Sequence, residues 1–546
     1  MARKIAVIDS ETDPFKRDRV PKPFVWGFYD GSIYKEFEQV EDLIIYCYDK
    51  RLIVYAHNGG KFDYHFMLNF IEPFTDIMII NGRISSFKIG ECEFRDSYNI
   101  LPTALSAYQK TQIDYAIFEP KERTKKKNKK LISDYLKDDC FDLYNYVSSF
   151  IEKFGMNLTV AGTAMKQWQR ISGIKAPRDL GGVNYEKFKS FYYGGRCESF
   201  TYGIIKGDFE MIDINSAYPY AMLSNHPISI DHMPLSYAEW EALPSDLVKG
   251  PTFIMLEGIS KGALPFRGKD NSLYFPNDNI KRTYRVTGWE LLAAIETGAL
   301  FNWEYIEGFI FNETINFSDY VLHYYEERKE AKRVKDILGD IFSKLMMNSL
   351  YGKFGSNPEE YKSYQTAPHD VIDNNGCAGE WSYAGDFGNN ALLRKELDEE
   401  GKRFYNLPTA ASITGFVRAY LWRALCQCDG LLYCDTDSIA AKKINLKPGH
   451  FGKELGQWDW DGEFKSGAFA GRKLYAMEYK KPITNKEGKK ITHKIASKGV
   501  RLNAKEIYKV AGGNKVIYMP EAPTFSIHKE PRFTPRTINI SKKSLQ

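Results

Sequence analysis

The chain has 546 residues, of which 43% are hydrophobic and 27% charged, and its net charge is +5 at pH 7. This length is enough for roughly three or four compact units with real cores. The opening residues lack the apolar stretch of a signal peptide, and no run of about 18 apolar residues occurs, so neither a signal peptide nor a membrane span is expected. The expected location is the cytoplasm. Eight cysteines without CxxC spacing are interpreted as reduced thiols, mostly in cores.

The first chemical motif follows directly after the N-terminus. KIAVIDSETD (4–13) reads as a buried strand. Asp9 and Glu11 are two residues apart, so they project from one face of that strand. Such a carboxylate pair is costly to bury without a counter-charge, which makes it a candidate metal site.

Two further segments of the N-terminal third supply similar groups. YAHNGGKFDYHF (55–66) brings Asp63 after a glycine-rich turn. SDYLKDDCFDLYNYV (133–147) is typical of a helix, on which Tyr135 and Asp139 share a face. Four carboxylates and a tyrosine can hold two metal ions and orient a water for attack on a phosphodiester. Any one of these acids alone is equally well explained as a surface residue.

Positive charge is concentrated in two places. The run 121–130 carries seven Lys or Arg against one Glu, and the simplest interpretation is a solvated, mobile loop. The tail 503–546 carries eight against three. In the tail the basic residues alternate with aromatic ones, which suits contact with a nucleic-acid backbone; these aromatic residues are Tyr508, Tyr518, Phe525 and Phe533.

Two strand-like segments in the middle of the chain end in aspartates. FEMIDINSAYPYAM (209–222) delivers Asp213 at the end of an apolar run that a proline interrupts. YCDTDSI (433–439) places Asp435 and Asp437 at what reads as the turn of a buried hairpin. Mg²⁺ prefers clustered oxygen ligands of this kind, although a lone DxD is also common in ordinary surface turns.

A long helical stretch is expected from about residue 318 to 355. Within KLMMNSLYGKFG (344–355), Lys344, Asn348 and Tyr351 fall on one stripe of the helix, and Lys332 lies three turns upstream. Most such stripes are simply solvated. Beside a metal-binding carboxylate pair, however, this stripe can hold a triphosphate and stack on a base.

These segments together resemble a known enzyme family. DINSAYP, KLMMNSLYGKF and YCDTDSI resemble motifs A, B and C of family B DNA polymerases, in the same order, and are most similar to the protein-primed branch of phages and linear plasmids. AGRKLYA (470–476) is similar to the KxY motif of that family, and FYYGGR (191–196) to its YxGG motif. The 4–13, 55–66 and 133–147 segments resemble the three motifs of its 3′–5′ proofreading exonuclease.

The resemblance implies the fold, α/β and α+β. A ribonuclease-H-like exonuclease domain would be followed by a right-hand polymerase of palm, fingers and thumb with two insertions. The implied limits are 1–153 for the exonuclease, 154–222 and 405–502 for the palm, 223–310 and 356–404 for the insertions, 311–355 for the fingers and 503–546 for the thumb. About 130 residues separate Asp213 from Lys344, far more than a simple connection needs.

It also implies roles for individual residues. The polymerase carboxylates would be Asp213, Asp435 and Asp437, and the exonuclease would use Asp9, Glu11, Asp63, Asp139, Tyr135 and Lys110. The incoming nucleotide would contact Ile214, Tyr218, Lys332, Lys344, Asn348 and Tyr351. DNA would contact Thr12, Asn58, Phe62, Ser97, Tyr98, Tyr115, Tyr192, Gly194, Gly195, Lys473 and Tyr475. Each active site would hold two Mg²⁺ ions, for which Mn²⁺ can substitute.

The sequence departs from the family at three places. HNGGKFD is one residue longer than the shortest family form, Ala217 stands where leucine is usual, and Asp340 stands where some relatives have a lysine. The last departure concerns the phosphate contacts of the nucleotide.

The function implied is a template-directed DNA polymerase with a proofreading exonuclease. Its partners would be template and primer DNA, dNTPs and a terminal protein that primes synthesis, with no membrane involved. Two alternatives stay open: a DNA-primed or primer-independent polymerase of the same fold, and a non-catalytic DNA-binding scaffold. The seven clustered carboxylates speak against the scaffold, which has no use for buried like charges.

Overall fold

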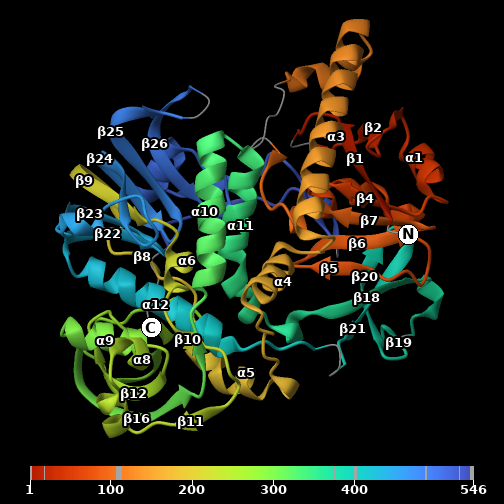
Figure 1. The fold of residues 1–546 in the computed structure, drawn as a ribbon. Coiled ribbons are helices and arrows are strands. Elements are labelled where there is room, and N and C mark those ends of the chain that lie inside the picture. The colour runs from red at the N-terminus through yellow and green to blue at the C-terminus, as the bar shows by residue number, and fades with distance from the viewer. Residues whose placement is uncertain are drawn as a thin grey trace.

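The computed structural model describes residues 3–16, 19–105, 113–373, 375–398, 402–485, 488–527 and 529–541, without the side chains of 529 and 530. Lys110 lies outside the described residues. Two seven-stranded sheets, far apart in the ribbon, organise the fold (Figure 1). None of the helices in the described ranges is long and apolar enough to cross a membrane.

The first sheet comes from residues 4–96 and has the order β3-β2-β1-β4-β7-β6-β5. Strand β1 pairs antiparallel with β2 and parallel with β4, which is parallel to β7. Side chains alternate along β1, so Val7 packs toward helix α3 while Ala6 and Ile8 join the core on the other face. The strand and helix bounds are β1 Lys4–Thr12, β2 Pro23–Tyr29, β3 Tyr34–Phe37, α1 Val40–Cys47, β4 Leu52–Ala56, β5 Met78–Ile80, β6 Arg83–Ile89, β7 Cys92–Asp96 and α3 Lys126–Phe154.

The second sheet has the order β26-β25-β24-β9-β23-β22-β8, with β9 at its centre. Helix α12 connects the second insertion to this sheet and is buried along most of its length. Helix α11 packs between α12 and α4. The bounds are β8 Cys197–Ser199, β9 Gly203–Ile214, β22 Cys428–Asp435, β23 Ser438–Ile444, β24 Trp458–Gly471, β25 Leu474–Thr484, β26 Lys490–Ser497, α4 Val160–Ser172, α5 Val183–Phe188, α6 Ala217–Ala221 and α12 Leu407–Leu425.

The helical stretch expected from 318 is two antiparallel helices rather than one. Helix α10 spans Ser318–Val334 and α11 spans Ile337–Phe354, and they lie side by side in Figure 1. Lys335 adopts a left-handed backbone with φ of 62°, which ends α10. The Asp336 side chain then accepts a hydrogen bond from the Gly339 N–H and caps the next helix. The aspartate cap was the local signal for this break.

The segment 223–310 forms a unit with its own sheet, of order β11-β16-β12-β15, and its own apolar core. Its elements are β10 His226–Pro227, β11 His232–Pro234, α7 Tyr237–Ala242, α8 Asp246–Lys249, β12 Phe253–Ser260, β13 Phe266–Arg267, β14 Leu273–Tyr274, β15 Arg282–Thr287, α9 Gly288–Glu296 and β16 Leu300–Phe311. Short strand β17 (Thr314–Ile315) pairs with β10 and returns the chain to α10.

The segment 356–404 contributes a second small sheet, which packs on the first large one. Phe387 and Leu392 enter the core of the first sheet, and the Asn390 side chain donates a hydrogen bond to the Ile71 carbonyl at 2.7 Å. The strands are β18 Lys362–Ala367, β19 Cys377–Ala378, β20 Trp381–Phe387 and β21 Asn390–Glu396.

The C-terminal segment also reaches the first sheet. The Phe525 ring lies 5.3 Å from the Phe62 ring, measured between centroids. Its elements are α13 Ala504–Ala511, β27 Val516–Tyr518, β28 Thr524–Ser526, β29 Lys529–Arg532 and β30 Arg536–Ile538.

The prediction of a mobile loop at 121–130 is wrong. These residues form helix α2 (Pro120–Arg123) and the first turns of α3. Lysine is a good helix former, so charge density alone does not indicate a loop. Four of the eight cysteines are buried, and all eight are free thiols.

Candidate active sites

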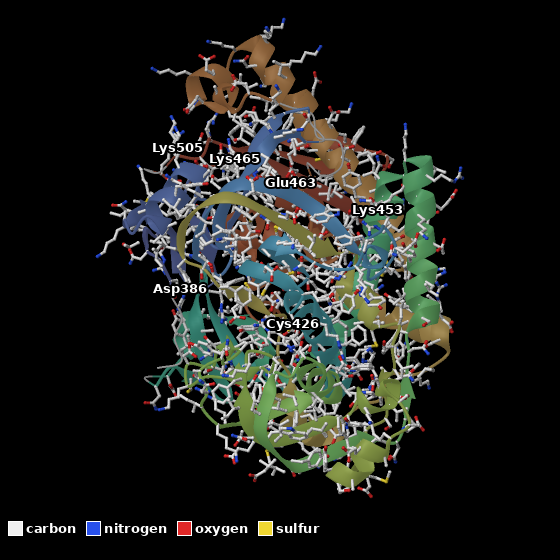
Figure 2. All side chains as sticks on the ribbon, turned by 90° about the vertical axis from the view of Figure 1, so that its left-hand side faces the viewer. Asp386, Cys426, Lys453, Glu463, Lys465 and Lys505 are labelled. Carbon is white, nitrogen blue, oxygen red and sulfur yellow. The ribbon has the colours of Figure 1, made fainter. Side chains whose placement is uncertain are left out.

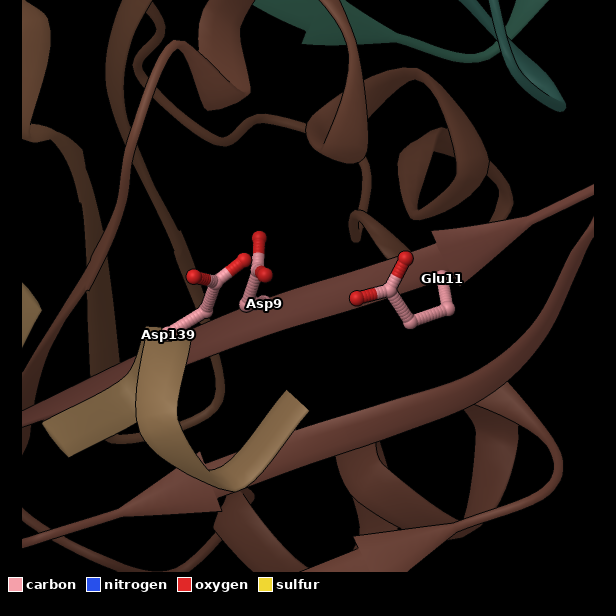
Figure 3. A group of neighbouring side chains, drawn as sticks. All are labelled: Asp9, Glu11 and Asp139. Atoms are coloured by element: carbon pink, nitrogen blue, oxygen red, sulfur yellow. The ribbon is translucent and has the colours of Figure 1, made fainter. Parts of the chain in front are cut away.

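Three carboxylates, two on strand β1 of the first sheet and one on helix α3, lie together. Ligand oxygens of Asp9, Glu11 and Asp139 are all within 4.8 Å of one another, which confirms the expected shared face of β1 (Figure 3). Helix α3 crosses β1 and β2 and so brings Asp139 to that face. Among the described residues no other three acids, histidines or cysteines come this close together. Three carboxylates at this spacing suit a divalent cation, because oxygen ligands of this number and charge balance its charge.

Asp63 lies beside the trio's strand but outside the trio. The Ser10 hydroxyl donates to Asp63 Oδ1 at 2.5 Å, and Ser10 stands between Asp9 and Glu11 on the opposite face of β1. Burial raises the pKa of Asp63 to about 6. Asp63 is therefore a buried carboxylate that prefers a neutralising partner.

The residues expected to hold single-stranded DNA differ in how exposed they are. The Tyr135 hydroxyl lies 3.3 Å from that of Tyr115, whose side chain is half exposed. Ser97 is fully buried and lies 3.0 Å from Nδ1 of His57, so its hydroxyl faces the protein. Thr12 is also buried, and its hydroxyl donates to the Asp13 carbonyl at 3.2 Å.

Arg83 was missed by the sequence reasoning. Its Nη1 donates to Asn58 at 2.8 Å and to buried Asp96 at 2.7 Å, and its guanidinium lies over the Tyr98 ring. It thereby links two of the expected DNA contacts, Asn58 and Tyr98. A lone arginine in a strand carries no sequence signal for such a role.

The aspartates of the second sheet meet across two neighbouring strands. Asp213 on β9 is the register partner of Ser438 on β23, and the Ile214 N–H donates to the Asp437 carbonyl at 2.7 Å. The predicted hairpin is confirmed, with Thr436 in the left-handed region at φ of 62°. Asp213 and Asp437 are thereby brought to one end of the sheet by backbone pairing alone.

Their electrostatic environments differ. Burial, followed by repulsion from Asp213 and Asp435, raises the pKa of Asp437 to about 6. Burial also raises the pKa of Asp213. Asp435 instead accepts two hydrogen bonds of 2.6 Å from the Lys473 ammonium. Lys494 lies near both Asp213 and Asp437 and offsets part of their charge, but the pKa of each aspartate stays raised, which fits a bound divalent cation.

Residues expected at the nucleotide fall into two groups. The rings of Tyr218 and Tyr351 stack at 4.2 Å between centroids, beside the aspartates. Lys344 and Asn348 are exposed on α11, and the Asn348 amide donates to the Lys344 carbonyl at 2.8 Å. The side chain of Ile214 is buried, and its backbone N–H is already bonded to the Asp437 carbonyl.

Lys332 lines a basic cavity of about 300 Å³. Neither Lys344 nor Asn348 lines it. Figure 2 shows Lys453, another lining residue, beside helices α10 and α11. The remaining lining residues are Asn215, Ser216, Tyr325, Arg328, Lys329, Glu454 and Leu455.

Arg328 accounts for the departure at Asp340. Its Nε, on α10, donates to Asp340 Oδ1, on α11, at 2.7 Å. The negative charge at the position where relatives have a lysine is therefore held by an arginine of the facing helix. The sequence alone did not indicate that Arg328 and Asp340 form an ion pair.

The FYYGGR segment packs against the DTD turn. The Thr436 N–H donates to the Arg196 carbonyl at 2.6 Å. A Cβ on Gly195 would meet Thr436 at 2.8 Å and the Tyr218 hydroxyl at 3.0 Å, so this close approach requires glycine. A side chain on Gly194 would meet no atom.

Arg418 holds the same segment from behind and was not found by sequence reasoning. Its Nη1 donates to the carbonyls of Tyr193 and Gly194 at 2.6 and 2.9 Å. Its Nε donates to Glu290 at 2.7 Å, and both side chains are 1% exposed. Helix α9 of the 223–310 unit is thereby connected to the loop beside the aspartates.

The remaining expected DNA contacts take part in packing. Tyr192 is half-buried and packs against Gly355, where a Cβ would lie 2.7 Å from the Tyr192 hydroxyl. Tyr475 is buried against Tyr433, whose hydroxyl accepts a hydrogen bond from the Lys473 N–H at 2.8 Å.

A carboxylate trio at the first sheet and an aspartate pair at one end of the second, beside a basic cavity, are the arrangement of a nucleic-acid polymerase with a nuclease domain. Residues 106–386 match the family described as DNA polymerase type B, organellar and viral. The chain is 36% identical to the DNA-directed DNA polymerase of Enterobacteria phage PRD1, over 98% of both chains. It is also 24% identical to the DNA polymerase of Bacillus phage PZA, over 89% of both.

The fold is also that of solved polymerases. Phi29 DNA polymerase complexed with primer-template DNA and incoming nucleotides superposes with a TM-score of 0.73 at 20% identity, covering 99% of this chain and all of that one. An orthorhombic crystal form of phi29 DNA polymerase gives 0.75 at 18% identity, with the same shares covered. The chain belongs to the type B DNA polymerases of organelles and viruses.

Proposed function

We propose that this polymerase extends a 3′-hydroxyl on a DNA template with Asp213 and Asp437, and removes mispaired 3′ ends with Asp9, Glu11 and Asp139. The observation that carries the proposal is the presence of two carboxylate groups on two different sheets. Two separate centres allow synthesis and degradation by one chain. The solved complexes of phi29 DNA polymerase with primer-template DNA and incoming nucleotides support DNA and dNTPs as the partners.

In the palm, Asp213 and Asp437 would hold Mg²⁺, with Asp435 beside them and oriented by Lys473. The bound ions would supply charge stabilisation at the reacting phosphate and lower the pKa of the primer hydroxyl. Lys332, Arg328 and Lys453 would bind the triphosphate, because they line one basic cavity next to Asn215 and Ser216. Base pairing supplies the sequence information, so these contacts need only position the nucleotide.

The stacked Tyr218 and Tyr351 rings form a rigid wall next to the aspartates. A ring against the sugar C2′ leaves no volume for an added oxygen, so Tyr218 would select deoxynucleotides. Gly195 keeps that wall in place, since any side chain there would displace the Tyr218 hydroxyl or Thr436.

In the exonuclease, the trio would hold Mg²⁺ and Tyr135 would orient the attacking water. Asp63 would join the ligands by exchanging its Ser10 hydrogen bond, because a buried carboxylate with a raised pKa gains from a cation. Phe62, packed on Phe525, would contact the single-stranded 3′ end, with Asn58 and Tyr98 held by Arg83.

We further propose that the 223–310 unit docks a priming protein. It has its own core and exposes large apolar side chains, among them Phe301 and Ile306 on β16, which are 46% and 49% exposed. Exposed apolar groups of this size are typical of interaction surfaces. In the infected cell such a reaction would take place in the host cytoplasm, where template and dNTPs are found.

The catalytic proposal is tested with a labelled hairpin primer and Mg²⁺. The wild-type protein should degrade the 3′ end when dNTPs are absent and extend it when they are present. Replacing Mg²⁺ with Mn²⁺ should retain both reactions, since Mn²⁺ accepts the same oxygen ligands. A protein that binds the hairpin but changes its length under neither condition would be a scaffold.

The docking proposal needs a surface change rather than a deletion, because deletion of 223–310 would also remove Glu290, the partner of Arg418. Phe301→Ser with Ile306→Ser should spare DNA-primed extension and abolish initiation on a terminal-protein hydroxyl. The control is Ile33→Ser with Ile45→Ser, two side chains of the first domain that are 47% and 69% exposed. Equal loss of both reactions would refute docking, and a chain that starts only on DNA primers would favour the DNA-primed alternative.

A further inference from the structure

The N-terminal end of helix α3 extends beyond the rest of the first domain. Helix α3 begins at Lys126, and its first turns, with the short helix α2 beside them, project beyond the rest of the ribbon in Figures 1 and 2. Lys126, Lys127 and Lys130 are exposed there and, with Leu131 and Asp134, line a shallow hollow. We call these three lysines the α3 basic end.

Charge is unusually segregated along this helix. From Asp134 onward the helix carries five acids and two lysines, whereas 126–130 holds four lysines and one asparagine without an acid. Neighbouring lysines differ from this group, since Lys125 pairs with Glu122 and Lys153 at the far end pairs with Glu327. Within the described ranges, no ion pair involves Lys126, Lys127 or Lys130.

This arrangement opposes the helix's own electrostatics. Lysines in the first turn face the positive end of the helix dipole, where acidic residues are favoured. Lys126 and Lys130 are also a like-charged pair four residues apart, which weakens a helix. An anionic partner would reverse both effects, because it supplies negative charge where the helix has none.

We propose that the α3 basic end binds the phosphate backbone of DNA outside both active sites. The same helix carries Asp139, 13 residues after Lys126, which corresponds to roughly 20 Å along the axis. The lysines lie on the side of the helix turned away from Asp139, so they would hold DNA without entering the exonuclease site.

The partner is nucleic acid rather than an acidic protein. A protein interface needs a desolvated apolar centre, and Leu131 is the single large apolar side chain of the hollow. Mobile lysines without such a centre suit sequence-independent phosphate contacts. The inference rests on the proposed function, in which DNA is the substrate.

The test compares Lys126→Gln, Lys127→Gln, Lys130→Gln with the wild-type protein by fluorescence anisotropy on a labelled duplex and on a labelled single strand. We expect binding about tenfold weaker at low salt, and a salt slope smaller by roughly two to three units. The salt slope should fall more for the form of DNA, duplex or single strand, that contacts these lysines. Extension and degradation at saturating DNA should be unchanged.

The control is Lys4→Gln, Lys35→Gln, Lys88→Gln, which removes the same charge from exposed sites of the same domain. Arginine at 126, 127 and 130 should retain wild-type binding, which excludes a folding defect. Equal slopes for the glutamine triple variant and the control would overturn the inference. Failure of the wild-type protein to bind DNA would instead refute the proposed function.

Discussion

Asp437, a proposed metal ligand, is electrostatically unfavourable in its ionised form in the folded protein. Its pKa is raised from 3.8 to about 6 by burial and then by Asp213 and Asp435. A group whose pKa is higher in the folded state contributes stability that is present below about pH 4 and lost as the pH rises through about 6. The metal-free protein is therefore destabilised by this carboxylate at neutral pH.

Asp437→Asn should consequently stabilise the metal-free protein while it removes the proposed synthesis. Above about pH 7 we expect the free energy of unfolding to rise on the order of 1 to 3 kcal/mol, because the buried repulsion disappears. Urea unfolding in EDTA at about pH 5 and about pH 8 measures this. The gain should shrink at the lower pH, and a loss of stability at the higher one would contradict the assigned electrostatics.

Tyr218→Val should admit ribonucleotides. The stacked ring on Tyr351 is lost, which opens volume beside the sugar of the nucleotide. Single-nucleotide incorporation of dNTP and rNTP on the same primer gives the ratio, which we expect to fall by at least about tenfold. Tyr220→Val, a nearby tyrosine on the same short helix, is the control, and an unchanged ratio in folded Tyr218→Val would refute the gate.

The positions of the candidate carboxylates could be predicted, whereas the side chains that contact them could not. Asp213, Asp435 and Asp437 follow from the ends of apolar strands, because strand alternation and turn chemistry are local. The Lys473 contact to Asp435 and the Arg418 contacts to Tyr193 and Gly194 join residues far apart in the chain. No periodicity encodes such pairs.

At the scale of elements, helices α9 and α12 are joined by two arginine–glutamate pairs of opposite character. Arg418 and Glu290 are 1% exposed, whereas Arg423 and Glu296 are about a third exposed. Removing one partner of a buried pair leaves an uncompensated charge, while an exposed pair is well solvated.

Glu290→Gln should therefore lower the free energy of unfolding by roughly 3 kcal/mol. The glutamine keeps one oxygen to accept from Thr287, but its amide NH2 cannot accept from Arg418, so the variant loses both the charge and that hydrogen bond. Glu296→Gln, the exposed counterpart, should cost less than about 1 kcal/mol. Urea unfolding compares the two, and equal effects would show that burial does not decide the energy of the pair.

Elements with strong periodicity were predicted well and their interruptions poorly. Strand β1 was predicted from its run of apolar residues. The β22–β23 hairpin was predicted from two apolar runs with a turn between them. The break at Lys335 depends on a single helix cap at Asp336. The start of α3 at Lys126 depends on the helix propensity of lysine within a charged run. Hydrophobic patterns carry little information on either feature.

At the scale of the whole molecule, segments distant in sequence complete the first domain. Phe387 and Leu392 enter its core, and Phe525 packs on Phe62. The sequence predicted separate units along the chain, but not that segment 356–404 and the C-terminal segment pack on the first domain. Such docking depends on surface complementarity between units, which becomes visible only in three dimensions.

The central claim, two independent metal centres on two sheets, is tested most directly by one cross-comparison on a 3′-labelled mispaired hairpin with Mg²⁺. Asp437→Asn should abolish extension and retain removal of the mispaired end, while Asp9→Ala with Glu11→Ala should abolish removal and retain extension of a paired end. Loss of both activities in either folded variant, or removal at the wild-type rate in the double variant, would contradict the account.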